Sequence, residues 1–309
     1  MNSPTFALSK YQLMQAYTGE LAALLVAVFW TITAISFEVA SKRVGSLAVN
    51  IIRLGFALVF LSIYGLLVRG FVLPTDASSH QWIWLALSGL IGFVFGDYFL
   101  FHSYRMISSR IAMLVMTFVP PVTAVLGWLL LGETMGVLHL VGMTLTVGGI
   151  VLTVFNKVKG QKIQLKYPAK GLFYAFLGVL GQACGLVLSK YGMQDYDPFA
   201  ATQIRIIAGF IGFALIVVLN GKIPLILSAF KNTKAMWGIT SGSFFGPFLG
   251  VSFSLLAIQH TTTGVAATLM AIVPILIIPP AALFLKQKVS LMDYIGAVIS
   301  VGGVALFFL

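Results

Sequence analysis

Long apolar runs separated by short polar stretches make up most of this 309-residue chain. Each run is close to the length of about 20 residues that a helix needs to cross the hydrocarbon core of a bilayer. A spanning run must be helical, because lipid offers no partner for an unpaired backbone group. The pattern predicts ten membrane-spanning helices, at residues 20–40, 47–68, 82–103, 108–131, 136–155, 170–190, 199–219, 235–258, 263–285 and 290–309.

The apolar pattern also repeats within the chain. Pro120 and Pro274 each interrupt a spanning segment, and they stand 154 residues apart. The same offset relates glycine pairs in the preceding spans, which are Gly92 and Gly96, and Gly246 and Gly250. A unit of five helices ends on the membrane face opposite its start, so its copy must be inverted. We therefore predict an all-α fold with a first repeat at 19–155, a basic linker at 156–169 and an inverted second repeat at 170–309.

Composition agrees with a membrane protein. The chain is 59% hydrophobic and 9% charged, with a mean hydropathy of +1.02, whereas soluble proteins are about a quarter charged. Cys184 is alone, which excludes a disulfide framework and a thiolate metal site. We predict no metal and no cofactor.

The formal net charge of +11 comes mainly from short loops between spans. We therefore interpret it as a membrane-topology signal, and we predict no nucleic-acid partner. Of the 19 lysines and arginines, 14 fall on the side that carries the linker. The positive-inside rule places that side in the cytoplasm and both termini outside.

Three ionisable side chains are predicted to lie inside the bilayer, where such a group costs about 2.5–3.5 kcal/mol. Arg53 and Arg205 hold matching places in the two repeats, and each is either a carboxylate or phosphate site or a structural brace. Asp97, whose counterpart is Val251, is either an ion-pair partner of Arg53 or a protonation site that couples transport to proton entry.

Other polar side chains have weaker assignments. Glu38 is interpreted as a cavity carboxylate or an interfacial charge. Tyr98 and His102 share one stripe of the third span and are candidate cavity residues. His102 is also either a proton shuttle or a simple hydrogen-bonding group.

Glycines and prolines carry structural predictions. The Gly92–Gly96 and Gly246–Gly250 pairs form small-xxx-small faces for close helix packing. Pro120 and Pro274 are the expected flexing points, because a proline releases a backbone carbonyl from the helix. The ninth span also contains Pro279-Pro280 and should be more distorted than the fourth.

Several runs resemble a known family. WTITAIS from Trp30 resembles the start of an EamA domain. GLIGFVFGDYFLFHSYRMISSRIA from Gly89, PPVTAVLGWLLLGE from Pro120 and GMTLTVGGIVL from Gly142 resemble its remainder. Two such domains in tandem make the ten-helix drug/metabolite transporter superfamily. The resemblance implies a central cavity lined by the helices that carry Trp30, Gln182 and Phe245.

The chain departs from the family pattern in two places. Residues 285–287 read Leu-Lys-Gln where the first repeat has Leu-Gly-Glu at 131–133, so the acidic turn occurs once. Family members are also described with cytoplasmic termini, contrary to the charge count.

These features together predict a secondary transporter in the plasma or inner membrane. We expect an exporter of small metabolites such as amino acids, working by alternating access between inverted repeats. A monomer in the lipid bilayer is expected, with protons as a candidate coupling ion. The alternatives are a channel-like facilitator and an intramembrane enzyme. The enzyme is disfavoured because only Asp97 is well inside a span and the four histidines are scattered singly.

Overall fold

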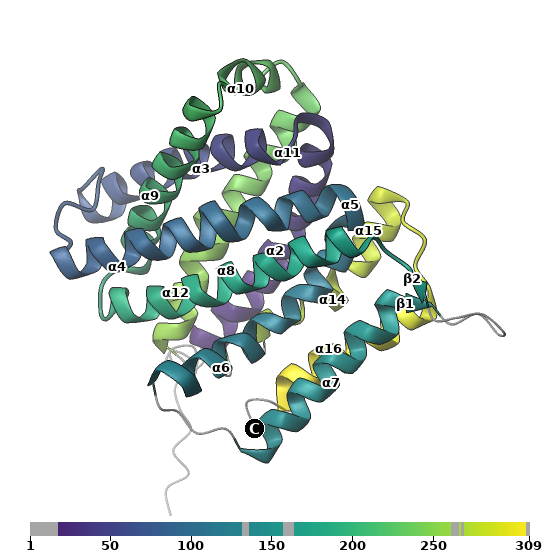
Figure 1. Cartoon of the computed structure of the whole chain (residues 1–309). Helices are drawn as coiled ribbons and strands as arrows, with labels where there is room; N and C mark the ends of the chain where they lie inside the picture. The colour runs from purple at the N-terminus through teal and green to yellow at the C-terminus, as the bar shows by residue number, and fades with distance from the viewer. Residues whose placement is uncertain (1–17, 132–135, 157–163, 261–265, 267–268, 307–309) are drawn as a thin grey trace, which may run out of the picture.

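The computed structural model describes residues 18–131, 136–156, 164–260, 266 and 269–306. Almost all of these residues are helical (Figure 1). The helices are α2 (Thr18–Val44), α3 (Ser46–Tyr64), α4 (Ser79–Gly89), α5 (Tyr98–Val115), α6 (Val119–Leu131), α7 (Val137–Val154), α8 (Ala169–Met193), α9 (Pro198–Leu219), α10 (Ile223–Ala229), α11 (Thr233–Ser243), α12 (Val251–His260), α14 (Val273–Leu276), α15 (Ile278–Leu285) and α16 (Leu291–Leu306). Two short strands, β1 (Phe155–Asn156) and β2 (Gln164–Leu165), pair antiparallel between the two halves.

Several helices are joined end to end by turns of different pitch. A π-helical segment, Leu90–Asp97, connects α4 to α5, and a second one, Phe244–Gly250, connects α11 to α12. In the described residues, six continuous helices are long and apolar enough to cross a membrane, and three further apolar helices are shorter. The described residues of the ten predicted spans are mostly helical, so the predicted all-α polytopic membrane fold is confirmed.

The third and fourth spans meet at Ser108. Its backbone has φ 71° and ψ 156°, outside the helical range, and it divides α5 into two shorter helices. The helical stretch from Ser79 to Thr123 therefore contains the third predicted span and the beginning of the fourth, with no separate loop between them.

The corresponding helices of the two halves pack against each other in opposite directions. At the contact of α7 with α16, Gly149 meets Gly296 and Ser300, while Gly303 meets Gly142 and Thr146. These are the same contact with the repeats exchanged, because each pair of counterparts stands 154 residues apart. Figure 1 shows α7 and α16 side by side at one edge of the molecule.

The remaining helix pairs follow the same exchange. In the first half, α4 and α5 pack on α8 of the second half, and α11 and α12 of the second half pack on α2 of the first. The helix α3 packs on its own counterpart α9, with Ser62 accepting a hydrogen bond from Gln203 at 3.1 Å. The core of the molecule therefore lies between the two repeats.

Both prolines lie next to irregular turns in their helices. A 3₁₀ turn, Met116–Phe118, precedes Pro120, after which α6 continues without interruption to Leu131. The counterpart segment starts at Val273, next to Pro274, and is divided again at Ile277 into α14 and α15. The second copy is therefore the more distorted one. The acidic turn at Glu133 lies outside the described residues.

Candidate functional site

Arg53 and Asp97 form an ion pair in the core between the repeats. Their Nη2 and Oδ2 atoms are 2.5 Å apart, and the side chains are only 4% and 8% exposed. Arg53 lies in α3, and Asp97 is the last residue of the π-helical segment Leu90–Asp97. Of the two alternatives for Asp97, the structure thus contains the ion pair with Arg53.

The pair is surrounded by further hydrogen bonds. Gln182 of α8 donates to Asp97 Oδ1 at 2.6 Å, which brings in a residue from the second repeat. Asn50 accepts a bond from Arg53 Nε at 3.1 Å. Sequence reasoning missed Asn50, although it stands three residues before Arg53 on the same helix face. Both oxygens of Asp97 therefore have a donor.

Aromatic rings complete the surroundings of Arg53. The guanidinium carbon lies 4.6 Å from the ring centroid of Phe101, 5.5 Å from that of Phe37 and 5.6 Å from that of Phe93. Such cation–π contacts favour a desolvated guanidinium. Arg53 is thus stabilised by a carboxylate, an amide and three rings.

Arg205 of α9 has different surroundings. It is 5% exposed, and its guanidinium carbon lies 5.0 Å from the Phe93 ring centroid. Its Nε atom is buried without a hydrogen-bond partner, and no ion pair to Arg205 occurs within the described residues. Gly92 packs beside the guanidinium, where an added Cβ would come within 3.4 Å of Nη2.

The predicted packing glycines lie at inter-repeat contacts. Gly96 faces Gly181 of α8, and Gly92 faces Gly185 one turn further along. In the second repeat Gly246 faces Thr33, and Gly250 faces Trp30.

Trp30 and Phe245 belong to an aromatic region where α2 meets α11 and α12. The Phe245 ring lies 5.7 Å from Phe29, and Phe29 in turn lies 5.9 Å from Phe253. Trp30 stands 152 residues before Gln182, the offset that also relates Arg53 to Arg205. The contact of α2 with the segment Phe244–Gly250 is therefore aromatic, whereas the matching contact of α8 with the segment Leu90–Asp97 contains the Asp97 carboxylate.

Tyr98 and His102 lie on a different side of α5. The His102 Nδ1 atom is 3.0 Å from the Ser46 hydroxyl, and its ring lies 5.3 Å from Tyr174. The Tyr98 ring is 5.7 Å from His102. These contacts are with one another and with helix ends, and none of them joins the ion pair.

Glu38 has a role that neither sequence interpretation included. It is 1% exposed and accepts hydrogen bonds from the backbone N and the hydroxyl of Ser109, at 2.7 and 2.5 Å. Ser109 begins the helix that follows the break at Ser108, so Glu38 caps a helix N-terminus, where a negative charge is favourable. Lys42 and Gln287 also donate to Glu38.

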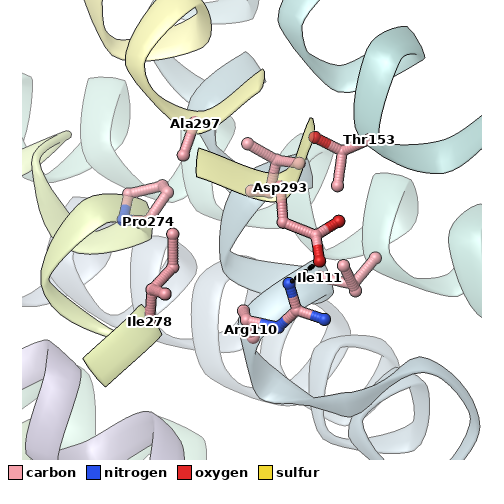
Figure 2. A pocket seen from close by; sticks show the side chains of 8 residues that line it. Arg110, Ile111, Thr153, Pro274, Ile278, Asp293 and Ala297 are labelled. Atoms are coloured by element: carbon pink, nitrogen blue, oxygen red, sulfur yellow. Dashed lines mark ion pairs between the residues drawn. The ribbon is translucent and has the colours of Figure 1, made fainter. Parts of the chain in front are cut away.

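A second buried ion pair joins Arg110 to Asp293 at the same end of the molecule (Figure 2). Their closest atoms are 2.8 Å apart, and Lys166 reaches the other oxygen of Asp293 at 3.1 Å. Arg110 is one of the 14 charges counted on the linker side, and it is only 6% exposed. Asp293 also caps α16 by accepting from Ser290 N, and the Ser-x-x-Asp spacing was a readable signal for that cap.

The opposite end carries its own polar cluster. Arg69, at the end of the second span, lies 2.5 Å from Asp76 and 3.8 Å from Asp197. Tyr196 donates to Asp76 at 2.9 Å, and burial together with that carboxylate raises the pKa of Tyr196 to about 12. Each end of the molecule therefore has a polar network that connects the first repeat with the second.

Comparison with known proteins agrees with this architecture. A crystal structure of another protein superimposes with a TM-score of 0.61 at 15% identity, over 93% of this chain and 95% of that one, which supports the fold. The WAT1-related protein At3g02690, chloroplastic, of Arabidopsis thaliana is 21% identical over 283 residues, 90% of this chain and 66% of its own. The uncharacterized transporter YdfC of Bacillus subtilis (strain 168) is 24% identical over 231 residues, 72% of this chain and 70% of its own.

The chain thus spans about two thirds of the length of these relatives. The sequence profile of the EamA-like transporter family matches it twice, at residues 17–155 and 169–309. With two tandem matches that cover nearly the whole sequence, the chain belongs to the EamA-like transporter family.

Proposed function

We propose that this protein is a secondary transporter that exports a small amphipathic metabolite, such as an amino acid, by alternating access between its two repeats. The observation that carries this proposal is the buried group of Arg53, Asp97 and Arg205 at the contact between the repeats. Ionisable side chains in a membrane interior are costly and are found mainly on substrate and ion pathways.

The polar networks at the two ends support alternating access. One end is held by Arg110 and Glu38, which contact Asp293 and Gln287 of the second repeat. The other end is held by Arg69 and Asp76, which contact Asp197 and Tyr196 of the second repeat. Both networks cross from one repeat to the other, so opening one while keeping the other would expose the central group to one side at a time.

The chemistry of the central region supports an amphipathic solute. Charged groups lie where α8 meets the segment Leu90–Asp97, and aromatic rings around Trp30 and Phe245 lie where α2 meets the segment Phe244–Gly250. A solute with one charged and one apolar part could use both regions, which suits amino acids and related metabolites.

Transport in proteoliposomes tests the proposal. We expect uptake of radiolabelled amino acids that saturates with concentration and that accelerates when unlabelled solute is loaded inside. Flux that stays proportional to concentration and shows no such exchange would establish the channel-like alternative.

Proton coupling is tested by the same assay under an imposed pH gradient. If Asp97 is the proton site, Asp97→Asn abolishes gradient-driven uptake and leaves exchange intact. An unchanged response to the gradient in Asp97→Asn excludes Asp97 from that role.

We place the protein in a plasma or inner membrane with both termini outside. Without the buried Arg110, the count of lysines and arginines on the linker side falls by one, and that side still carries the excess of positive charge. A reporter enzyme fused after residue 309 decides the orientation, since cytoplasmic activity would reverse it.

A further inference from the structure

The central group of charges does not balance. Within the described residues it contains two guanidinium groups, of Arg53 and Arg205, and a single carboxylate, of Asp97. Both guanidinium carbons lie against the Phe93 ring, at 5.6 and 5.0 Å. One positive charge therefore has no counter-ion in this part of the core.

The hydrogen bonds identify which arginine carries the excess charge. Asp97 Oδ2 is 2.5 Å from Arg53, and Asp97 Oδ1 receives Gln182 at 2.6 Å. Arg205 faces the same carboxylate from beyond ion-pair distance, and its buried Nε has no partner. The repeat explains the difference, because Val251 stands where a second aspartate would pair with Arg205.

A buried cation without a counter-ion is costly, whereas a guanidinium that meets a carboxylate forms strong, directional bonds. Its planar fork of N–H donors fits the two oxygens of a carboxylate. A structural brace would need an ion-pair or hydrogen-bond partner, and among the described residues Arg205 has only the Phe93 ring beside it.

We propose that Arg205 binds the carboxylate of the transported solute and that Arg53 does not. This inference rests on the proposed transport function and specifies the class of substrate. A single carboxylate would balance the single excess charge. A phosphate, with about −1.5 to −2 charges, would exceed it. The ligand class is therefore a small monocarboxylate, including the zwitterionic amino acids.

The experiment compares matched solutes on the purified full-length protein in detergent micelles. The probes are L-leucine with L-leucinamide, benzoate with benzamide, and inorganic phosphate, and the readout is the midpoint of thermal unfolding. We expect a carboxylate to raise the midpoint while its amide and phosphate do not. Arg205→Gln should abolish this shift, and the same change at the exposed Arg105 should retain it.

Arg205→Lys provides a second variant that keeps the charge. It should retain the preference for carboxylate over amide with an affinity reduced about tenfold, since a lysine lacks the planar fork. The proposal is overturned if amides stabilise as well as carboxylates, if no carboxylate stabilises the wild-type protein, or if Arg205→Gln keeps the shift. Saturable exchange of solutes without a carboxylate would leave the transporter proposal standing and remove only this anchor.

Discussion

The two repeats place an arginine at the same position and then surround it differently. Arg53 has an aspartate, an asparagine and three aromatic rings around it, while Arg205 has one ring and an unbonded Nε. Two substitutions accompany the difference, since Asp97 corresponds to Val251 and Gln182 corresponds to Trp30. The two repeats thus share the arginine position and differ in the side chains that surround it.

The comparison separates structural from functional arginines. An arginine that both repeats need as a structural brace should have bonding partners in both repeats. The glycines Gly149 and Gly303 show such equivalence, because they make matching packing contacts in the two repeats. Only one of the two arginines is satisfied. The unsatisfied one is therefore the better candidate for a ligand contact.

The largest expected effect on stability comes from breaking the Arg53–Asp97 ion pair of the first repeat. Asp97→Asn leaves Arg53 buried without a carboxylate, and we expect a loss of about 3–5 kcal/mol in the free energy of unfolding. The double variant with Arg53→Gln should lose less than the sum of the two single losses, as measured by chemical denaturation in micelles. Additive losses would contradict a coupled pair.

A smaller effect is expected where the repeats agree. At Gly149 an added Cβ would overlap the Gly296 carbonyl and Ser300, whereas at neighbouring Gly148 nothing lies within 4 Å. Gly149→Ala should therefore destabilise the protein by about 1–3 kcal/mol, the usual cost of overpacking. Gly148→Ala is the matched control and should leave the unfolding midpoint in place. Equal effects of the two changes would contradict the observed packing of α7 on α16.

The smallest effect on stability is expected from giving the second repeat the aspartate that the first repeat has. Val251→Asp supplies the carboxylate that the second repeat lacks. It should be tolerated better with Arg205 present than in the Arg205→Gln background, with a coupling on the order of 1 kcal/mol. Val251→Asn, measured in both backgrounds, controls for polarity without charge. Zero coupling would show that the position does not face Arg205.

Much of the fold was predictable because lipid imposes a simple rule on the sequence. The apolar runs of spanning length predicted where the described part of the chain is helical, and the offset of 154 residues revealed the duplication. The pairing of Arg53 with Asp97 was one of the two alternatives that the sequence offered for these residues. These inferences depend on distance along a helix, which the sequence states directly.

The remaining features depend on how distant segments pack. Glu38 caps a helix that begins 71 residues later, and Gln182 reaches Asp97 across 85 residues. The Arg110–Asp293 pair was hidden because both residues lie at helix ends, where charges are usually solvated. The break at Ser108 could not be predicted either, because no proline or glycine lies beside it in the sequence. Such contacts appear only when the repeats are assembled.

The central claim is that the two matching arginines differ in whether the protein itself satisfies them. Thermal unfolding of Arg53→Gln and Arg205→Gln, side by side in micelles without added solute, tests it most directly. The claim predicts a marked drop in midpoint for Arg53→Gln and an unchanged or raised midpoint for Arg205→Gln, because only the first change breaks an existing pair. A drop for Arg205→Gln as large as that for Arg53→Gln would contradict it.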